Sequence, residues 1–227
     1  MEDTPPRLPR PPGFAALPPH VMSPDLSRLL TDLGPGCDSS GEIATAFNHV
    51  SSIVQAVEET LRRSKTFWRH ENNLALIEWL GPATHFLLSM SRPIEVDDEA
   101  RGIQLLPEAI RLALLLLLAA LKQEVFLFTA HEADYLRCKF STRVAHLREA
   151  DYDHPCGTLY LWALVTVSLL SHSTQPGLYV NDIRSVLGRL GITSVEGMDM
   201  VNSLLSINIL GVQATDLLPA LVLSSCT

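Results

Sequence analysis

The sequence predicts an all-α fold, a single multi-helix domain built around a buried, leucine-rich central helix. The first observation is the stretch Ile110–Phe128, whose middle, Leu112–Leu121, reads LALLLLLAAL without a polar side chain. The second is composition: 47% of the residues are hydrophobic but only 6% are aromatic, and leucine and alanine favour helices over sheets. The third is that apolar residues elsewhere recur every three or four positions, as in helices with one buried side. Because a helix that is apolar on all sides must be buried on all sides, we expect this stretch at the centre of the domain.

Two features place the start of the central helix and argue against a membrane span. Pro107 and Glu108 are residue types that the first turn of a helix favours, so the helix should begin there. The uncharged run lies between Arg111 and Lys122 and is well short of the roughly 20 residues that a span through lipid requires. We therefore expect a helix buried in protein and no membrane segment.

Residues 1–22 differ in composition from the rest of the chain. Seven of them are proline, which fixes φ and removes backbone donors, so the sequence predicts a disordered, proline-rich arm. Residues 23–227 are predicted to form one all-helical domain, since 227 residues suit a single domain. It should open with a short helix that Ser23 caps and that ends at Gly34.

Net charge and cysteine spacing restrict the class of protein. The formal net charge is −8, which argues against a chain that binds nucleic acid through bulk electrostatics. The four cysteines are scattered without a CxxC pair, as in a reduced, intracellular protein.

An amphipathic helix is expected well before the central one. Ser39 and Glu42 have the spacing of a capping box. Behind them an apolar seam repeats at intervals of four and three residues: Ile43, Phe47, Val50, Val54, Val57 and Leu61. We expect this seam to face the core, and to be a candidate surface for a partner helix if it is not fully covered.

The next segment is expected to break at a proline. Apolar residues continue at helical spacing from Leu74 to Leu80. Gly81-Pro82 then interrupts the pattern, because proline lacks a backbone N–H and clashes inside a helix. We therefore predict a helix end there and a further short helix over Thr84–Met90.

Four more helices are expected after the central one. The first has an outer face of basic residues: Arg137, Lys139, Arg143 and Arg148. The second, Leu159–Leu170, is again strongly apolar and contains Trp162, so it should pack against the central helix. A third helix is closed by Gly191, and Thr193 with Glu196 forms a capping box that opens the fourth.

No catalytic, cofactor-binding or metal-binding residue is predicted. The His-Glu pairs at His70 and His131 each lack the second histidine that a zinc-binding helix carries one turn on. The sequence contains no P-loop, GxSxG or GxGxxG motif. We therefore expect no enzyme activity and no cofactor.

One alternative is an all-helical, magnesium-dependent enzyme. Asp97-Asp98-Glu99 is similar to the aspartate-rich motif of class I terpene synthases, and Asn181-Asp182 is similar to the start of their second magnesium motif. Such enzymes hold Mg²⁺ against a diphosphate with carboxylates. This resemblance implies that Asp97, Asp98 and Asp182 would be the metal ligands.

Several apolar helical segments, in a fixed order, resemble a known family. They are Glu108–Leu115, the basic helix around Arg143–Leu147, Leu159–Leu164 and Gly191–Glu196, followed by the leucine-rich helix Met198–Leu210. From roughly Leu61 onward, the chain resembles the fungal-specific transcription factor domain, the all-helical region usually found after a zinc-cluster DNA-binding module.

The resemblance implies a non-enzymatic regulatory or protein-interaction domain in transcriptional control, for example of a biosynthetic gene cluster in secondary metabolism. It implies a nuclear location, with a cytoplasmic one as the alternative. It also implies a protein partner or a homodimer, and leaves room for a small-molecule effector. The six closely spaced cysteines of the family's zinc cluster are missing, and four scattered ones cannot form it. We therefore expect no direct, sequence-specific DNA binding by this chain.

Overall fold

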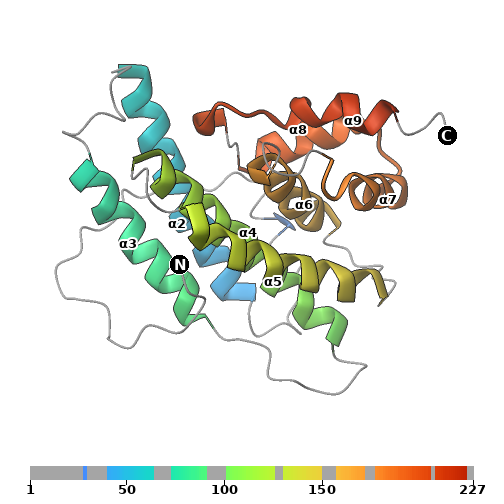
Figure 1. Ribbon diagram of the computed structural model, residues 1–227, viewed down its shortest axis with the longest axis horizontal. Coiled ribbons are helices and arrows are strands. Elements are labelled where there is room, and N and C mark those ends of the chain that lie inside the picture. The colour runs from blue at the N-terminus through green and yellow to red at the C-terminus, as the bar shows by residue number, and fades with distance from the viewer. Residues whose placement is uncertain are drawn as a thin grey trace.

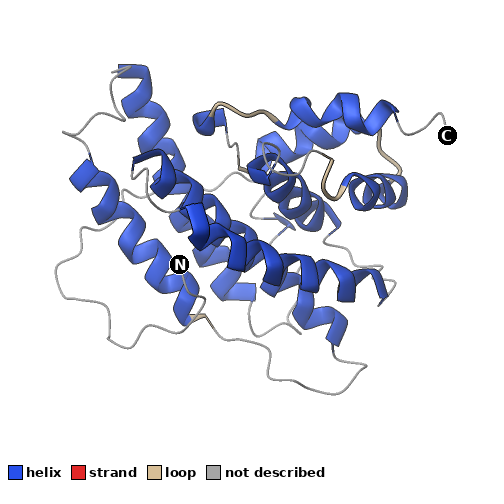
Figure 2. Ribbon diagram, viewed as in Figure 1, coloured by secondary structure: helices blue, strands red, loops and turns tan. Residues whose placement is uncertain are grey.

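The computed structural model describes residues 28–29, 40–63, 73–90, 101–125, 130–149, 157–171, 177–205 and 208–223. Every regular element within these ranges is a helix (Figure 1, Figure 2), which confirms the all-α prediction. The predicted arm at 1–22, the helix start at Ser23, and Asp97 and Asp98 lie outside the described residues. The elements are α2 (Ser40–Arg63), α3 (Asn73–Ser89), α4 (Arg101–Val125), α5 (Ala130–Glu149), α6 (Gly157–Ser171), α7 (Val180–Leu190), α8 (Ser194–Leu204) and α9 (Leu218–Leu223), with short 3-10 turns η2 (Asn208–Leu210) and η3 (Ala214–Leu217).

The leucine-rich helix α4 lies at the centre, as predicted. It packs against α2, α3, α5 and α6, and its side chains from 112 to 118 are at most 2% exposed. Removing each leucine of this run from water contributes about 1.5–3 kcal/mol relative to leaving it exposed. Neighbouring helices surround α4 on all sides. Each of its faces is therefore buried, and apolar side chains suit every position of this run.

The predicted start of α4 was wrong. The helix begins at Arg101, so Pro107 lies inside it rather than in its first turn. Proline has no N–H to donate to the carbonyl of Ile103, and the helix gives up that one bond. Leu105 and Leu106 are both buried in this added turn and a half, and their burial offsets the lost bond.

The predicted break in α3 was also wrong. One helix runs through Gly81-Pro82 to Ser89. The proline removes a hydrogen bond to the carbonyl of Glu78, a local cost of about 3 kcal/mol or more. The buried residues on both sides of it nevertheless form one continuous stripe against the core: Leu76, Leu80, Ala83, Leu87 and Met90. Packing along this stripe overrides the local preference.

The apolar seam of α2 faces the core, as expected. The seam residues from Ile43 to Val57 are at most 3% exposed, and Leu61 is partly buried. Other parts of the chain therefore cover this seam. It is not available as the surface for a partner helix that the sequence offered as a candidate. Ser39, the predicted cap, lies outside the described residues.

A second group of helices is built on α6. This helix is buried on nearly all sides and packs against α4, α7, α8 and η3. Figure 1 shows α6 to α9 gathered on one side of α4 and α5, opposite α3. Trp162 of α6 joins the two groups: its ring centroid lies 4.8 Å from that of Phe47 in α2, and its indole N–H donates to the carbonyl of Leu205 at 3.2 Å. Among the helices described, none has the length and apolar character needed to cross a membrane.

Candidate functional site

Asp182 is the one carboxylate of the predicted magnesium site that the structure describes. It lies in the first turn of α7 and is 8% exposed. Arg148, near the end of α5, holds both of its oxygens: Nη2 donates to Oδ2 at 2.6 Å, and Nε donates to Oδ1. An acid at a helix N-terminus and a cation at a helix C-terminus are each in the favourable place. The forked pair therefore joins α5 to α7.

Two tyrosines, Tyr160 and Tyr179, lie close enough to this ion pair to interact with it electrostatically. Burial, and then the negative charge of Asp182, raise the pKa of Tyr160 above its usual value. Burial likewise raises the pKa of Tyr179, against the lowering effect of its hydrogen bond with Ser141. The hydrogen bond to Asp182 is the main cause that raises the pKa of Arg148. Both tyrosines therefore stay protonated at neutral pH, and the guanidinium of Arg148 stays charged.

The turn before α7 sets the position of Asp182. Tyr179 has φ 62° and ψ 10°, a left-handed conformation that is uncommon for a residue other than glycine. Its hydroxyl shares a 2.6 Å hydrogen bond with Ser141 of α5, and Ser168 of α6 donates to the carbonyl of Leu178 at 2.6 Å. Two helices thus hold the strained residue in place, and α7 starts where its first turn meets Arg148.

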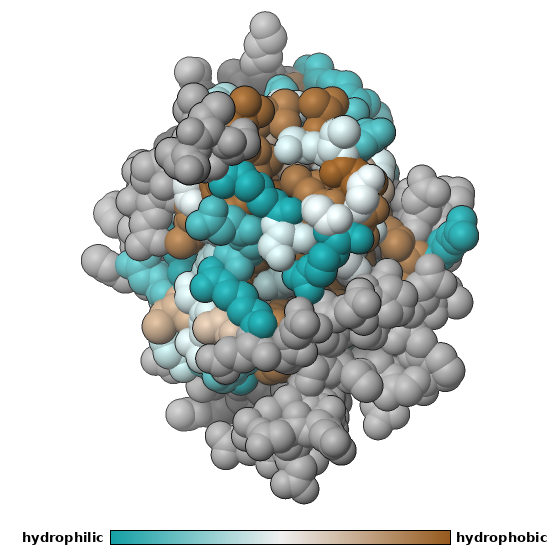
Figure 3. All heavy atoms as spheres, turned by 90° about the vertical axis from the view of Figure 1, so that its right-hand side faces the viewer, coloured by the Kyte–Doolittle hydropathy of each residue, from teal (hydrophilic) through white to brown (hydrophobic). Residues whose placement is uncertain are grey.

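Two further arginines bind the ends of neighbouring helices. Arg137 donates to the carbonyl of Leu170, near the end of α6, at 3.2 Å. Arg184 of α7 donates to the carbonyls of Leu221 and Ala220 in α9, at 3.0 and 2.6 Å. Carbonyls in a last helical turn lack helical partners, so these cations satisfy them. Figure 3, which faces the right-hand side of Figure 1, shows hydrophilic side chains crossing between hydrophobic ones on that face.

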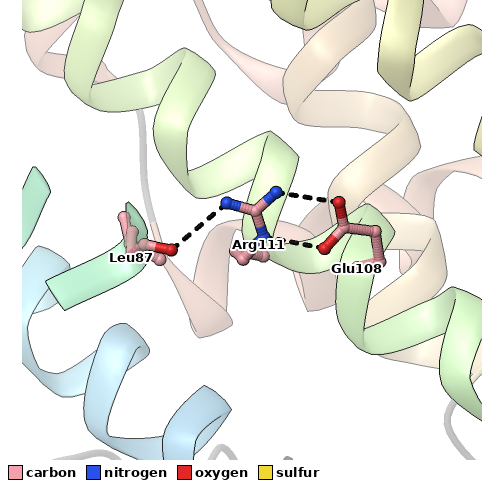
Figure 4. Close-up of polar contacts among 3 residues, drawn as sticks. All are labelled: Leu87, Glu108 and Arg111. Carbon is pink, nitrogen blue, oxygen red and sulfur yellow. Dashed lines mark hydrogen bonds and ion pairs between the residues drawn. The ribbon is translucent and has the colours of Figure 1, made fainter. Parts of the chain in front are cut away.

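A buried ion pair within α4, whose arginine also reaches α3, was not predicted. Arg111, 1% exposed, donates from Nε and Nη2 to Glu108 at 2.7 and 2.8 Å, and from Nη1 to the carbonyl of Leu87 at 3.2 Å (Figure 4). In the sequence, Arg111 marks only the edge of the uncharged run. The signal that was missed is the three-residue spacing from Glu108, which places both side chains on one side of the helix.

These arrangements hold helices together. Within the described ranges, no three His, Cys, Asp or Glu residues lie close enough to hold a metal ion. Cys138 carries an exposed thiol, but no acid or base of the cluster around Asp182 bonds to it. The contacts around Asp182 fix α5, α6 and α7 relative to one another.

Comparison of the chain with family models, with curated proteins and with solved structures gave no match. The function proposed below therefore rests on the sequence resemblance described above together with the chain's own contacts.

Proposed function

We propose that this chain is a non-enzymatic regulatory or protein-interaction domain of the fungal transcription factor type. It acts in transcriptional control in the nucleus, through a protein partner or a second copy of itself, and without sequence-specific DNA binding of its own. Control of a biosynthetic gene cluster is one example of such a role.

The observation that carries the proposal is the pairing of the polar side chains that join the helices. Arg111 binds the carbonyl of Leu87 in α3, Arg148 binds Asp182 in α7, and Arg184 binds backbone carbonyls of the last helix. Each of these contacts holds one element against another. A domain built in this way presents a stable surface, which is what a binding module requires.

The rival is an enzyme that holds Mg²⁺ with Asp97, Asp98 and Asp182. A magnesium ligand directs its carboxylate oxygens at the ion. Both oxygens of Asp182 instead accept hydrogen bonds from Arg148. For Asp182 to bind the metal, its forked ion pair with Arg148 would first have to separate, which favours the interaction domain over the enzyme.

Recovery of partners from cells tests the proposal. An affinity-tagged chain is expressed beside an untagged copy, and bound proteins are identified by mass spectrometry, with Leu115→Asp as a variant whose core is broken. We expect the tagged chain, but not the variant, to recover a protein of the transcription machinery or the untagged copy. A strictly monomeric chain that releases pyrophosphate from a prenyl diphosphate in the presence of Mg²⁺ would contradict the proposal.

A further inference from the structure

Helix α5 has three faces, and the first two are occupied by contacts within the chain. Its apolar face is buried against α4: Ala133, Leu136, Phe140, Val144 and Leu147. Its second face carries Arg137, Ser141 and Arg148, which bind α6, the turn before α7, and α7 itself. These two faces explain why α5 lies where it does.

The third face carries a row of basic and aromatic side chains, which we call the basic stripe: Tyr135, Lys139, Arg143 and His146. Successive members are four, four and three residues apart, so they share one side of the helix. Tyr135 is 50% exposed, and Nζ of Lys139 lies 4.9 Å from the centroid of its ring. Such a contact holds the cation over the ring face.

Arg143 distinguishes the stripe from an ordinary charged surface. The other two arginines of α5, Arg137 and Arg148, each bind a carboxylate. Arg143 is only partly exposed, yet no carboxylate of the described residues lies within ion-pair distance of it. A guanidinium offers five donors in a planar fork that fits a carboxylate.

We propose that the basic stripe is the docking surface for an acidic segment of a partner protein. The inference rests on the proposed function and names the surface through which it acts. Carboxylates of the partner bind Lys139 and Arg143, and an apolar side chain packs on the exposed ring of Tyr135.

Charge and length both favour a short acidic peptide over nucleic acid. The chain as a whole has a net charge of −8, so a long polyanion is repelled by most of the surface while a short segment meets the local cations. The stripe extends over about 17 Å at 1.5 Å per helical residue. An extended peptide of about five or six residues has the same length.

Peptide binding measured by fluorescence anisotropy tests the inference. The probe is a labelled peptide with a core of about six residues in which Glu alternates with Leu, compared with the same peptide carrying Gln in place of Glu. We expect the Glu peptide alone to bind, and roughly tenfold more weakly when Lys139→Gln and Arg143→Gln are combined. Tyr135→Ala, at an exposed position, should also weaken it.

The matched control combines Arg62→Gln and Arg63→Gln, which remove the same charge from α2, where both arginines face Glu58 and Glu59. This control should bind the peptide as the unchanged chain does, with equal far-UV CD for all variants. Equal loss in both double variants, no binding of the Glu peptide, or tighter binding of a short random-sequence duplex DNA would each overturn the inference. If the stripe variant still recovers the cellular partner, the stripe is refuted while the proposed function stands.

Discussion

Arg111 decides, at the scale of single residues, how the last turn of α3 meets α4. Its guanidinium is fully withdrawn from water and reaches Glu108 on its own helix and the carbonyl of Leu87 on the neighbouring one. Taking both charges out of water costs several kcal/mol, which their attraction and hydrogen bonds offset only while every partner is present. The ion pair therefore fixes the position of α3 against α4 more than it adds to the free energy of unfolding.

The first prediction follows from that balance. Arg111→Ala leaves the carboxylate of Glu108 buried without its cation, and we expect it to lower the free energy of unfolding by about 3–5 kcal/mol in urea titrations. Arg111→Met combined with Glu108→Leu removes both charges at similar volume and should cost much less. A stability of Arg111→Ala equal to that of the unchanged chain would show that the pair is not formed.

A second prediction concerns a glycine that allows two helices to approach. A Cβ on Gly197 of α8 would lie 2.3 Å from Cδ2 of Leu187, whereas one on Gly188 of α7 would meet no atom within 4 Å. Gly197→Ala should therefore lower the free energy of unfolding by about 1–3 kcal/mol. Gly188→Ala, inside the same pair of helices, should raise it by about 0.5–1 kcal/mol. Equal effects of the two substitutions would contradict the close approach.

At the scale of elements, the sequence correctly predicted two kinds of feature: helices that are apolar on every side, and helix caps that depend on a few neighbouring residues. The run of α4 and the apolar helix α6 are buried as expected, because a helix without a polar side must be buried whatever its neighbours are. The capping box of Thr193 and Glu196 is present in full, since it depends on four consecutive residues alone.

Other features depend on contacts that no local pattern contains. The helix start expected at Pro107 and the break expected at Pro82 do not occur, because burial on both sides of each proline outweighs one lost hydrogen bond. The pair of Arg148 and Asp182 joins residues 34 positions apart, and nothing in their spacing identifies them as partners. The candidate site therefore required the structure.

The capping box of α8 gives a third prediction, on pH. Hydrogen bonds from the backbone N–H and hydroxyl of Thr193 hold the pKa of Glu196 below its ordinary value of 4.5. Since the folded-state pKa is lowered, the stability that Glu196 contributes is present above pH 4.5 and is lost as the pH falls through the folded-state value. Glu196→Gln should be less stable than the unchanged chain at pH 7, and the difference should shrink below pH 4.5. A difference independent of pH would contradict this account.

The central helix gives the fourth prediction. Leu115 is fully buried, and Leu115→Asp would place a carboxylate there without a partner. Its desolvation and the lost packing approach or exceed the 5–15 kcal/mol margin of a typical domain, so we expect an unfolded chain by far-UV CD. Thr142→Asp, at an exposed position of α5, is the control and should stay folded. A soluble Leu115→Asp variant with unchanged helical CD would show that α4 is not the core.

At the scale of the whole molecule, α4 and Trp162 join two groups of helices. Helices α2, α3 and α5 pack against α4, whereas α7, α8 and η3 pack against α6, which itself packs against α4. The indole of Trp162 contacts Phe47 of α2 and the carbonyl of Leu205 after α8. The cations that lie between the groups are bound to acids or carbonyls, and the basic stripe lies on the side of α5 away from these contacts. The contacts of the described residues thus tie both groups of helices to α4 and α6.

A tethered reporter assay tests the central claim, regulation of transcription through protein binding, most directly. The chain is fused to an unrelated DNA-binding domain, and transcription from a reporter carrying its site is measured at matched protein levels. We predict that the fusion changes transcription several-fold relative to the DNA-binding domain alone, and that the Leu115→Asp fusion does not. A folded fusion that leaves the reporter unchanged would contradict the claim.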